Sequence, residues 1–286
     1  VVSTPVDGCS CAPMCLDDVR RALEERSSEK ESIHTLILEL PHRELGGKCT
    51  PYQDVLKMRE LCNSHDIRFH CDGARIFEAT AAYDKSMAEL AAPFDTVYIS
   101  FYKGLAGLSG AMLLGSHEFC EEARVWLRRF GGNLYTLLPY AVSGWSGYDK
   151  FWREHGRNRR QLSFVEKRDK LRRIVSQLQE DPAIGRCVTF DPLTPEVNMV
   201  HGYLRETNET CMSALDRVES LTGIRVLVRV REVSQLMDPA FDLGYRSKFE
   251  WVIGEANGRI PDDKFLQGWK VLAAELLVMG RAKREI

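Results

Sequence analysis

The stretch FHCDGARIFEA, residues 69 to 79, decides how the rest of the chain is interpreted. The start of this stretch favours a strand. The strand ends with the polar residues His70 and Asp72, before a turn at Gly73. In open parallel sheets, ligands bind beyond the carboxyl ends of the strands. Asp72 is therefore a candidate site carboxylate, although an ordinary turn aspartate would give the same pattern.

A second stretch of this kind, SFYKGLAGLSGA, spans residues 100 to 111 and follows the next apolar run. It places Lys103 among three glycines, which let the backbone turn sharply and approach a ligand closely. Burial lowers the pKa of a lysine and makes its amine a nucleophile that can form a Schiff base. A surface lysine on a loop is the alternative. The presence of Asp72 at the end of the preceding strand makes this surface alternative less favoured. A Schiff-base lysine and an aspartate on a pyridine nitrogen are the minimal apparatus of pyridoxal phosphate chemistry.

Apolar runs and amphipathic segments alternate on both sides of these two stretches. We expect strands at residues 33–40, 67–71, 96–100 and 111–115, and helices at residues 16–26, 51–65, 86–91 and 118–129. Short strands that alternate with helices favour a largely parallel sheet covered by helices. The predicted fold class is therefore α/β.

The composition changes after residue 149, where a long charged helical stretch runs to residue 178. Beyond it we expect strands at residues 186–190, 197–204, 225–230 and 249–253, and helices at residues 209–222 and 262–276. This order favours a smaller C-terminal α+β domain. We place the two domains at residues 1–155 and 156–286.

The bulk composition is that of an ordinary globular protein: 286 residues, 44% apolar and 28% charged, with a formal net charge of -2. This charge balance gives no reason to expect a nucleic acid partner. No apolar run is long enough to span a membrane. Nine cysteines, an odd number, lie mostly in expected strands and helices, which favours a reducing compartment, the cytoplasm or the mitochondrial matrix.

Two features of the first residues need separate interpretation. Cys9, Cys11 and Cys15 form a tight cluster, but no paired Cys or His spacing elsewhere supplies further ligands, so we expect no metal site. The chain opens on Val-Val, with no initiator methionine and no signal-like segment. We expect that an N-terminal portion, with any targeting sequence, is missing from it.

Several segments resemble the threonine aldolase and β-eliminating lyase family, which comprises pyridoxal phosphate enzymes of the aspartate aminotransferase fold, fold type I. HCDGARIFEA (70–79) and FDTVYISFYKGLAGLSGAMLLGS (94–116) resemble its aspartate and lysine motifs. LILELPHRELGGKCTP (36–51), RFGGNLY (129–135) and VNMV (197–200) resemble its Glu-x-x-His segment, its glycine-rich segment and a small-domain strand. By this resemblance, residues 1–155 would be the C-terminal part of a larger cofactor-binding domain.

The resemblance implies roles for the matching positions. Lys103 would form the Schiff base with pyridoxal 5'-phosphate, and Asp72 would pair with the pyridine nitrogen. His70 would support Asp72 from the same strand face. Arg75 would bind substrate acids beside the cofactor, and His42 would act as an acid or base near the substrate hydroxyl. Each of three residues has a purely structural alternative. Arg75 could form a local salt bridge, His42 could be a loop residue, and His70 could be a core histidine.

Two further positions depart from the family pattern. Tyr102 stands where the family usually has a small hydroxyl residue that contributes to phosphate binding, and we assign it to the cofactor site. The family has an arginine on a late small-domain strand that binds the substrate carboxylate. Arg246 is our candidate for this role, with Lys248 as the alternative.

The resemblance implies a pyridoxal-phosphate-dependent lyase of threonine aldolase type, which cleaves a β-hydroxy amino acid to glycine and an aldehyde. It also implies a homodimer or homotetramer. Two alternatives stay open: a β-eliminating amino-acid lyase, and a catalytically inactive relative that serves as a structural or interaction subunit of a larger assembly.

Overall fold

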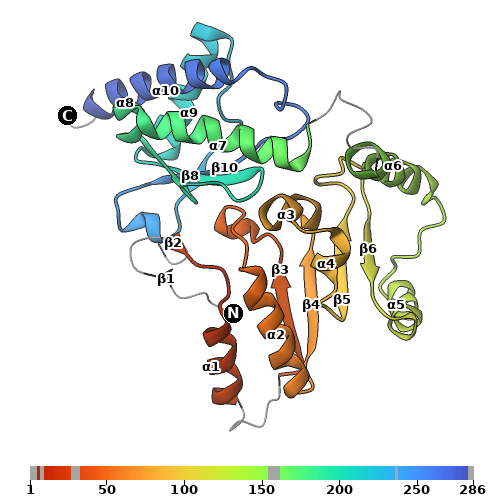
Figure 1. The fold of residues 1–286 in the computed structure, drawn as a ribbon. Helices are drawn as coiled ribbons and strands as arrows, with labels where there is room; N and C mark the ends of the chain where they lie inside the picture. Colours follow the sequence, from red (N-terminus) through yellow and green to blue (C-terminus); the bar gives the residue numbers. More distant parts are fainter. Residues whose placement is uncertain (1–4, 7–9, 27–32, 154–161, 236–237, 283–286) are drawn as a thin grey trace. The chain divides into compact units, whose positions relative to one another are not determined.

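The computed structural model describes residues 5–6, 10–26, 33–153, 162–235 and 238–282. The chain divides into two compact units, which are drawn in Figure 1. The sheet unit comprises residues 13–42 and 49–164, and the C-terminal unit comprises residues 1–12, 43–48 and 165–286. The predicted boundary between residues 155 and 156 lies outside the described residues and stays a prediction.

The sheet unit is built on four strands in the order β3-β4-β5-β6. These are β3 (Thr35–Glu39), β4 (Arg68–Gly73), β5 (Thr96–Ser100) and β6 (Ala111–Leu114). The first three run parallel to one another, and β6 runs antiparallel to β5. The expected largely parallel sheet is confirmed.

Six α-helices accompany this sheet in the described residues. They are α1 (Leu16–Arg26), α2 (Tyr52–Ser64), α3 (Ile76–Tyr83), α4 (Met87–Ala91), α5 (His117–Arg129) and α6 (Leu138–Tyr148). The sequence did not predict α3 or α6. Helix α3 is buried over most of its length and so lacks an amphipathic period, and α6 contains a proline and two glycines, which favour helices poorly.

The C-terminal unit carries a second sheet, in the order β7-β8-β10-β9, in which every strand pair is antiparallel. Its strands are β7 (Val188–Asp191), β8 (Met199–Leu204), β9 (Arg231–Glu232) and β10 (Ser247–Val252). Its helices are α7 (Phe164–Glu180), α8 (Pro182–Gly185), α9 (Asn208–Thr222) and α10 (Asp262–Ala282). A two-residue pair, β1 (Pro5–Val6) with β2 (Ser10–Cys11), and the turn η1 (Arg43–Leu45) also belong to it.

The predicted strand at residues 225–230 is wrong. The backbone there is irregular, and the strand ladder with β10 begins only at Arg231. The Arg225 side chain is held locally, by the carboxylates of Asp216 and Glu219 and by the carbonyl of Leu227. The alternating apolar residues therefore pack as a loop without a strand partner.

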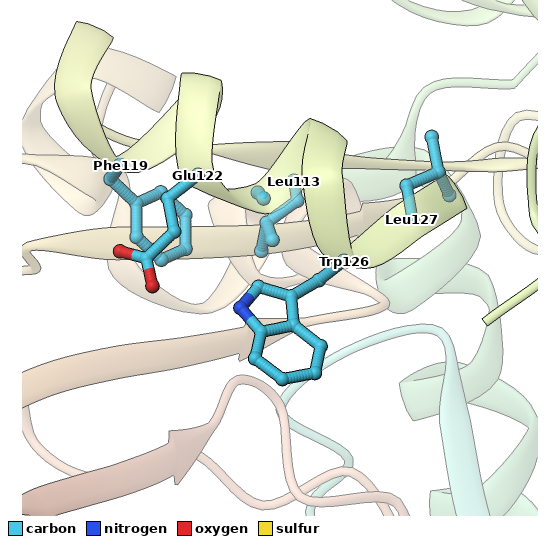
Figure 2. A pocket seen from close by; sticks show the side chains of 6 residues that line it. Leu113, Phe119, Glu122, Trp126 and Leu127 are labelled. Carbon is cyan, nitrogen blue, oxygen red and sulfur yellow. The ribbon is translucent and has the colours of Figure 1, made fainter. Parts of the chain in front are cut away.

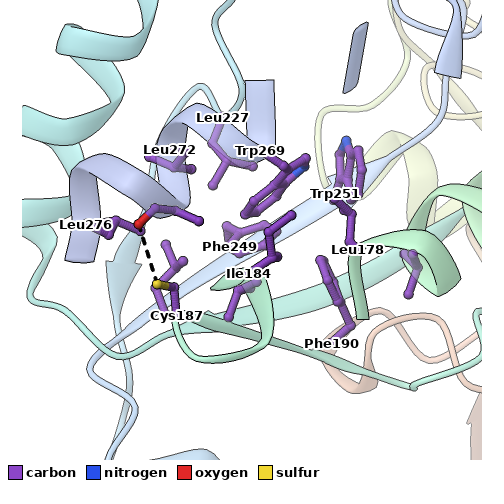
Figure 3. Close-up of a cluster of buried hydrophobic side chains, with 14 of the residues drawn as sticks. Leu178, Ile184, Cys187, Phe190, Leu227, Phe249, Trp251, Trp269, Leu272 and Leu276 are labelled. Carbon is purple, nitrogen blue, oxygen red and sulfur yellow. Dashed lines mark hydrogen bonds between the residues drawn. The ribbon is translucent and has the colours of Figure 1, made fainter. Parts of the chain in front are cut away.

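An aromatic cluster forms the centre of the C-terminal unit (Figure 3). Phe190 and Phe249 come from the sheet, as does Trp251, and Trp269 comes from α10. Trp269 is 1% exposed, and each of its ring contacts has a centroid separation of 5.5–5.8 Å. These rings bury a large apolar area, so the unit has a core of its own.

Candidate active site

Strand β4 carries the polar candidate residues His70 and Asp72. Phe69 and Cys71 point to the buried side of the strand, whereas His70 and Asp72 are partly exposed on the other side. Asp72 Oδ1 accepts a hydrogen bond of 3.1 Å from the Ala74 amide, which fixes the carboxylate at the strand end. The predicted shared face of His70 and Asp72 is confirmed.

The carboxyl ends of β4 and β5 lie next to each other because the strands are parallel, and Asp72 pairs in register with Tyr98. Ser100 Oγ, buried at the end of β5, donates a 2.7 Å hydrogen bond to the carbonyl of Ala74. This bond ties the two loops that leave the strands. Lys103 and Asp72 are thereby brought to the same edge of the sheet, as the two motifs predicted.

The loop after β5 is a tight turn that begins at Lys103. The Ala106 amide donates to the Lys103 carbonyl at 2.9 Å, and the Gly107 amide donates to the Phe101 carbonyl at 2.7 Å. Gly107 is required by a close approach: a Cβ atom there would lie 2.8 Å from the backbone oxygen of Phe101. The glycines thus hold Lys103 on a compact loop.

Lys103 is half-buried, and its amine lies over the ring of Tyr102, with Nζ 5.6 Å from the ring centroid. Tyr102 is 48% exposed. The structure therefore places Tyr102 beside the lysine. Its predicted role in phosphate binding stays a prediction.

Tyr98 is the neighbour of Asp72 on the next strand, and the sequence did not indicate it as a candidate. It shares the Asp72 row of the sheet and is partly buried. Burial, the neighbouring Tyr102 phenol and the nearby negative charge of Asp72 raise the pKa of Tyr98 to about 12. Its place two residues after Thr96 and two before Ser100, on an alternating strand, was the available signal.

His70 bonds across the sheet to its register partner. Its Nδ1 lies 2.7 Å from Thr96 Oγ1 on β5. Burial lowers the pKa of His70, and the charge of Asp72 acts in the opposite direction. The histidine is therefore held at a fixed position on the Asp72 face.

His42 follows β3 in the sheet unit, and its Nε2 lies 3.3 Å from the hydroxyl of the buried Thr50. Burial lowers the pKa of His42 to about 4, so its imidazole is neutral near pH 7. The Tyr83 hydroxyl donates to the Thr50 carbonyl at 2.5 Å and braces the same loop. His42 is thus a positioned neutral imidazole.

Arg75 stands at the N-terminus of α3, three residues after Asp72, and is partly buried. Its place beside the strand end is compatible with binding an anion at the carboxyl edge of the sheet. Its role in substrate binding stays a prediction.

Arg246 lies in the other unit, one residue before β10, and its side chain is engaged there. Its Nη1 donates to the carbonyls of Phe241 and Tyr245 at 3.1 and 3.0 Å, and its guanidinium lies over the Phe241 ring. The alternative, Lys248, is buried and forms a 2.7 Å ion pair with Asp238. The substrate role of either residue stays a prediction.

A hollow of about 400 Å³ lies between β6 and α5 (Figure 2). It is lined by Leu113, Phe119, Glu122, Ala123, Trp126 and Leu127. None of the predicted site residues lines it, although Leu113 is the register partner of Tyr98. The hollow has an apolar lining with one carboxylate, that of Glu122, so its lining provides few groups that could catalyse a reaction.

Neither a metal-binding cluster nor a membrane-spanning helix is found among the described residues. No cluster of three or more His, Cys, Asp or Glu residues there could bind a metal ion. Cys9 lies outside the described residues, and the thiol of Cys15 donates to Asp18. Among the described helices, none has the length and hydropathy needed to cross a bilayer.

The donor set at the sheet edge fits pyridoxal phosphate. Lys103 provides an amine on a glycine loop, and Asp72 provides a fixed carboxylate at the end of the adjacent strand. A cofactor with an aldehyde and a basic ring nitrogen requires this pair of groups. Lys103 and Asp72 would therefore hold it, with His70 on the same strand face.

Comparison with known proteins agrees with this geometry. The family model for β-eliminating lyases matches residues 1–187. A low-specificity L-threonine aldolase of Eremothecium gossypii is 27% identical over 159 residues, which are 53% of this chain and 41% of the relative.

Two solved structures share the fold. One, from Listeria monocytogenes, is provisionally named an L-allo-threonine aldolase; it has a TM-score of 0.76 at 29% identity and covers 92% of this chain and 66% of its own. The other, from Exiguobacterium, is provisionally named an aromatic amino acid β-eliminating lyase/threonine aldolase; it has a TM-score of 0.75 at 31% identity, with the same coverage. The fold is thus fold type I of the pyridoxal phosphate enzymes.

The chain is shorter than the proteins it resembles. It spans less than half the length of the curated relatives that it matches, and about two thirds of the two solved chains. The family match nevertheless covers well over half of the chain and includes both the Asp72 and the Lys103 motifs. The chain therefore belongs to the β-eliminating lyase family.

Proposed function

We propose that the protein is a pyridoxal-phosphate-dependent lyase of threonine aldolase type, which cleaves a β-hydroxy amino acid to glycine and an aldehyde. The observation that supports it most is the placement of Asp72 and Lys103 on the carboxyl ends of two adjacent parallel strands. The names of the relatives agree with this choice of substrate class.

When bound, the cofactor supplies an electron sink for the electrons of the bond that breaks. Lys103 would hold the cofactor through its amine. Asp72, fixed by the Ala74 amide, would favour a protonated ring nitrogen through its negative charge. His70 limits the movement of this strand end through its bond to Thr96.

We propose that His42 and Arg75 act on the substrate. His42, neutral because burial lowers its pKa to about 4, can accept the proton of the substrate hydroxyl. Arg75 presents a guanidinium, which suits bidentate binding of a carboxylate. With the hydroxyl proton on His42 and the carboxylate bound, the Cα–Cβ bond of the substrate could break. The hydroxyl oxygen would become the aldehyde oxygen, and a proton would return to Cα to give glycine.

The assembly and location of the protein are part of the proposal. We propose a homodimer or homotetramer, as in the family the sequence resembles, in a reducing compartment such as the cytoplasm or the mitochondrial matrix. Seven of the described cysteines form no disulfide, and five of these are buried, which agrees with such a compartment.

The first experiment asks whether the chain binds the cofactor on Lys103. The purified protein is incubated with pyridoxal 5'-phosphate, treated with borohydride, and digested for peptide mass spectrometry. We expect one cofactor on Lys103, and none on that position in Lys103→Ala. An unlabelled protein would contradict both lyase functions and favour the inactive interaction subunit.

The second experiment chooses between the two lyase reactions. The loaded protein is given threonine, and the products are separated by chromatography. Glycine and acetaldehyde in equal amounts support the aldolase, whereas a keto acid and ammonia would identify an eliminating lyase. The Asp72→Asn variant serves as the control, because it keeps the size of the side chain and removes the charge, so its activity should be lost.

A further inference from the structure

Helix α6 packs against the lysine loop, residues 101–108. The hydroxyl oxygen of Ser143 on α6 accepts a 2.9 Å hydrogen bond from the amide of Leu108, the last residue of this loop. Gly144 faces the first residue of the loop, because a Cβ atom on Gly144 would lie 3.1 Å from Cγ of Phe101. The loop is therefore in contact with α6 at its start and at its end.

Gly147 brings α6 closest to the lysine loop. It is buried, and a Cβ atom on it would collide with the carbonyl oxygen of Leu105, two residues after Lys103. Leu105 is completely buried, so it has little room to move aside. A side chain at position 147 would therefore push the backbone of the lysine loop away from the helix.

These contacts account for the unusual composition of α6. Glycine is unfavourable in the interior of a helix, but it allows another part of the backbone to come close. Ser143, Gly144 and Gly147 lie on one side of the helix, because they occupy positions i, i+1 and i+4. This side meets the lysine loop, so the helix gives up some intrinsic stability where the loop approaches it.

The other end of α6 is anchored on α3. Tyr148 is the last residue of α6, and Trp152 lies on the π-helical turn η2 (Asp149–Arg153) that follows it. The buried ring of Phe77 on α3 packs edge-on against both, with centroid separations of 6.3 Å to Tyr148 and 5.3 Å to Trp152. The helix that contacts the lysine loop is thus itself held in the core of the sheet unit.

We propose that α6 holds the lysine loop in place, with Ser143 and Gly147 as positioning residues for the Lys103 amine. Both residues act through the backbone of the loop: Ser143 binds its end, and Gly147 allows the helix to lie against its centre. The use of this arrangement rests on the proposed function, in which Lys103 and Asp72 hold one cofactor between them. The contacts themselves need no cofactor, so they can be tested in the protein alone.

The first test measures amide hydrogen exchange in the lysine loop, without cofactor and at the resolution of single residues. Ser143→Ala removes the acceptor of the Leu108 amide, so this amide should exchange about fivefold faster than in the parent. Ser146, an exposed residue of the same helix, provides the matched control, and Ser146→Ala should leave the rate unchanged. A parental Leu108 rate in Ser143→Ala would overturn the proposal.

The second test uses the close approach at Gly147. Gly147→Ala should displace the loop, so the amides of Ala106 and Gly107, whose hydrogen bonds close the turn, should exchange about tenfold faster. Gly185→Ala is the matched control, because a Cβ atom at this exposed helix end meets only a carbonyl oxygen at 3.9 Å. Parental rates in Gly147→Ala would contradict the proposal. If circular dichroism shows that Gly147→Ala does not fold, the Ser143→Ala result decides.

A third measurement separates this inference from the proposed function. With pyridoxal 5'-phosphate present, borohydride fixation on Lys103 should slow about tenfold in Gly147→Ala and less in Ser143→Ala, each checked for a parental circular dichroism spectrum. The two control variants should keep the parental rate. Equal rates in the parent and both test variants would overturn the positioning role. If the parent itself is not labelled, the proposed function fails, while the exchange results still decide whether α6 holds the loop.

Discussion

The two sheets of this protein are covered very differently. In the C-terminal unit, all six residues of the central strand β8 are buried. In the sheet unit, all four residues of β6 are exposed, and no residue of α5 is buried. The described part of the chain thus contains one sheet with a closed core and one that ends on an open apolar edge.

The open edge is rich in large apolar side chains. They include Met112, Leu113, Leu114, Trp126, Leu127 and Phe130, with exposed fractions from 41% to 82%. An exposed edge strand also leaves backbone groups unpaired, which makes it prone to pairing with another chain. Folding is therefore supported mainly by the C-terminal core and by the β3-β4-β5 part of the other sheet. The β6 edge adds little.

The sharpest test of this contrast pairs two tryptophans. Trp269→Ala removes a fully buried ring from the closed core and should lower the free energy of unfolding by about 3 to 5 kcal/mol. Trp126→Ala removes a ring that is 45% exposed at the open edge, and should cost less than about 1 kcal/mol. Urea unfolding followed by circular dichroism measures both. Equal losses would mean that α5 is covered in solution.

The same contrast should appear within the sheet unit alone. Leu38 on β3 is completely buried, whereas Leu113 on β6 is 42% exposed. Leu38→Ala should therefore cost about 2 to 5 kcal/mol, and Leu113→Ala less than about 1 kcal/mol. Because the two changes are chemically identical, a difference in the urea midpoint reports burial directly. A larger loss for Leu113→Ala would contradict the structure.

Each unit also contains a histidine that burial keeps neutral, His42 in the sheet unit and His201 in the C-terminal unit. Acid should therefore lower the stability of the folded chain through both. The pKa is about 4 for His42 and about 3 for His201, against 6.5 in the unfolded chain. Below pH 6.5 the unfolded chain binds a proton that the folded chain does not, so stability is full above pH 6.5 and falls as the pH falls. Between pH 7 and pH 4, each histidine should lower the free energy of unfolding by about 3 kcal/mol.

The variants His42→Gln and His201→Gln identify these contributions. Between pH 7 and pH 4, the free energy of unfolding of each variant should fall by about 3 kcal/mol less than that of the parent. Urea unfolding at the two pH values measures this difference. A variant with the acid sensitivity of the parent would show that its histidine is protonated in the folded state. His65, an exposed histidine at the end of α2, provides the matched control.

The smallest stability effect is expected for a charge on the open edge. Leu113→Lys should change the free energy of unfolding by less than about 0.5 kcal/mol, because the position is accessible to water. It should also reduce concentration-dependent association, since a lysine on an edge strand opposes pairing. Light scattering at increasing protein concentration tests this. Greater association of Leu113→Lys than of the parent would contradict it.

The sequence predicted the parts of the fold that depend on local pattern. Short apolar runs gave β3, β4 and β5, and two-residue alternation placed His70 and Asp72 on one face. It failed where tertiary contacts override the local pattern: α3 is buried on most sides, and residues 225–230 have strand-like alternation but no strand partner.

The sequence by itself determined the chemical groups of the candidate site and their order along the chain. Asp72 and Lys103 could be chosen because each follows an apolar run, beyond which ligands bind in open parallel sheets, and because both match motifs of the family. Tertiary structure alone decided which residues stand beside them. Tyr98 is 26 residues from Asp72, and only the parallel register of β4 and β5 brings the two together. Burial and neighbouring charge, which shift the pKa values of Tyr98 and His42, likewise depend on residues far apart in the sequence.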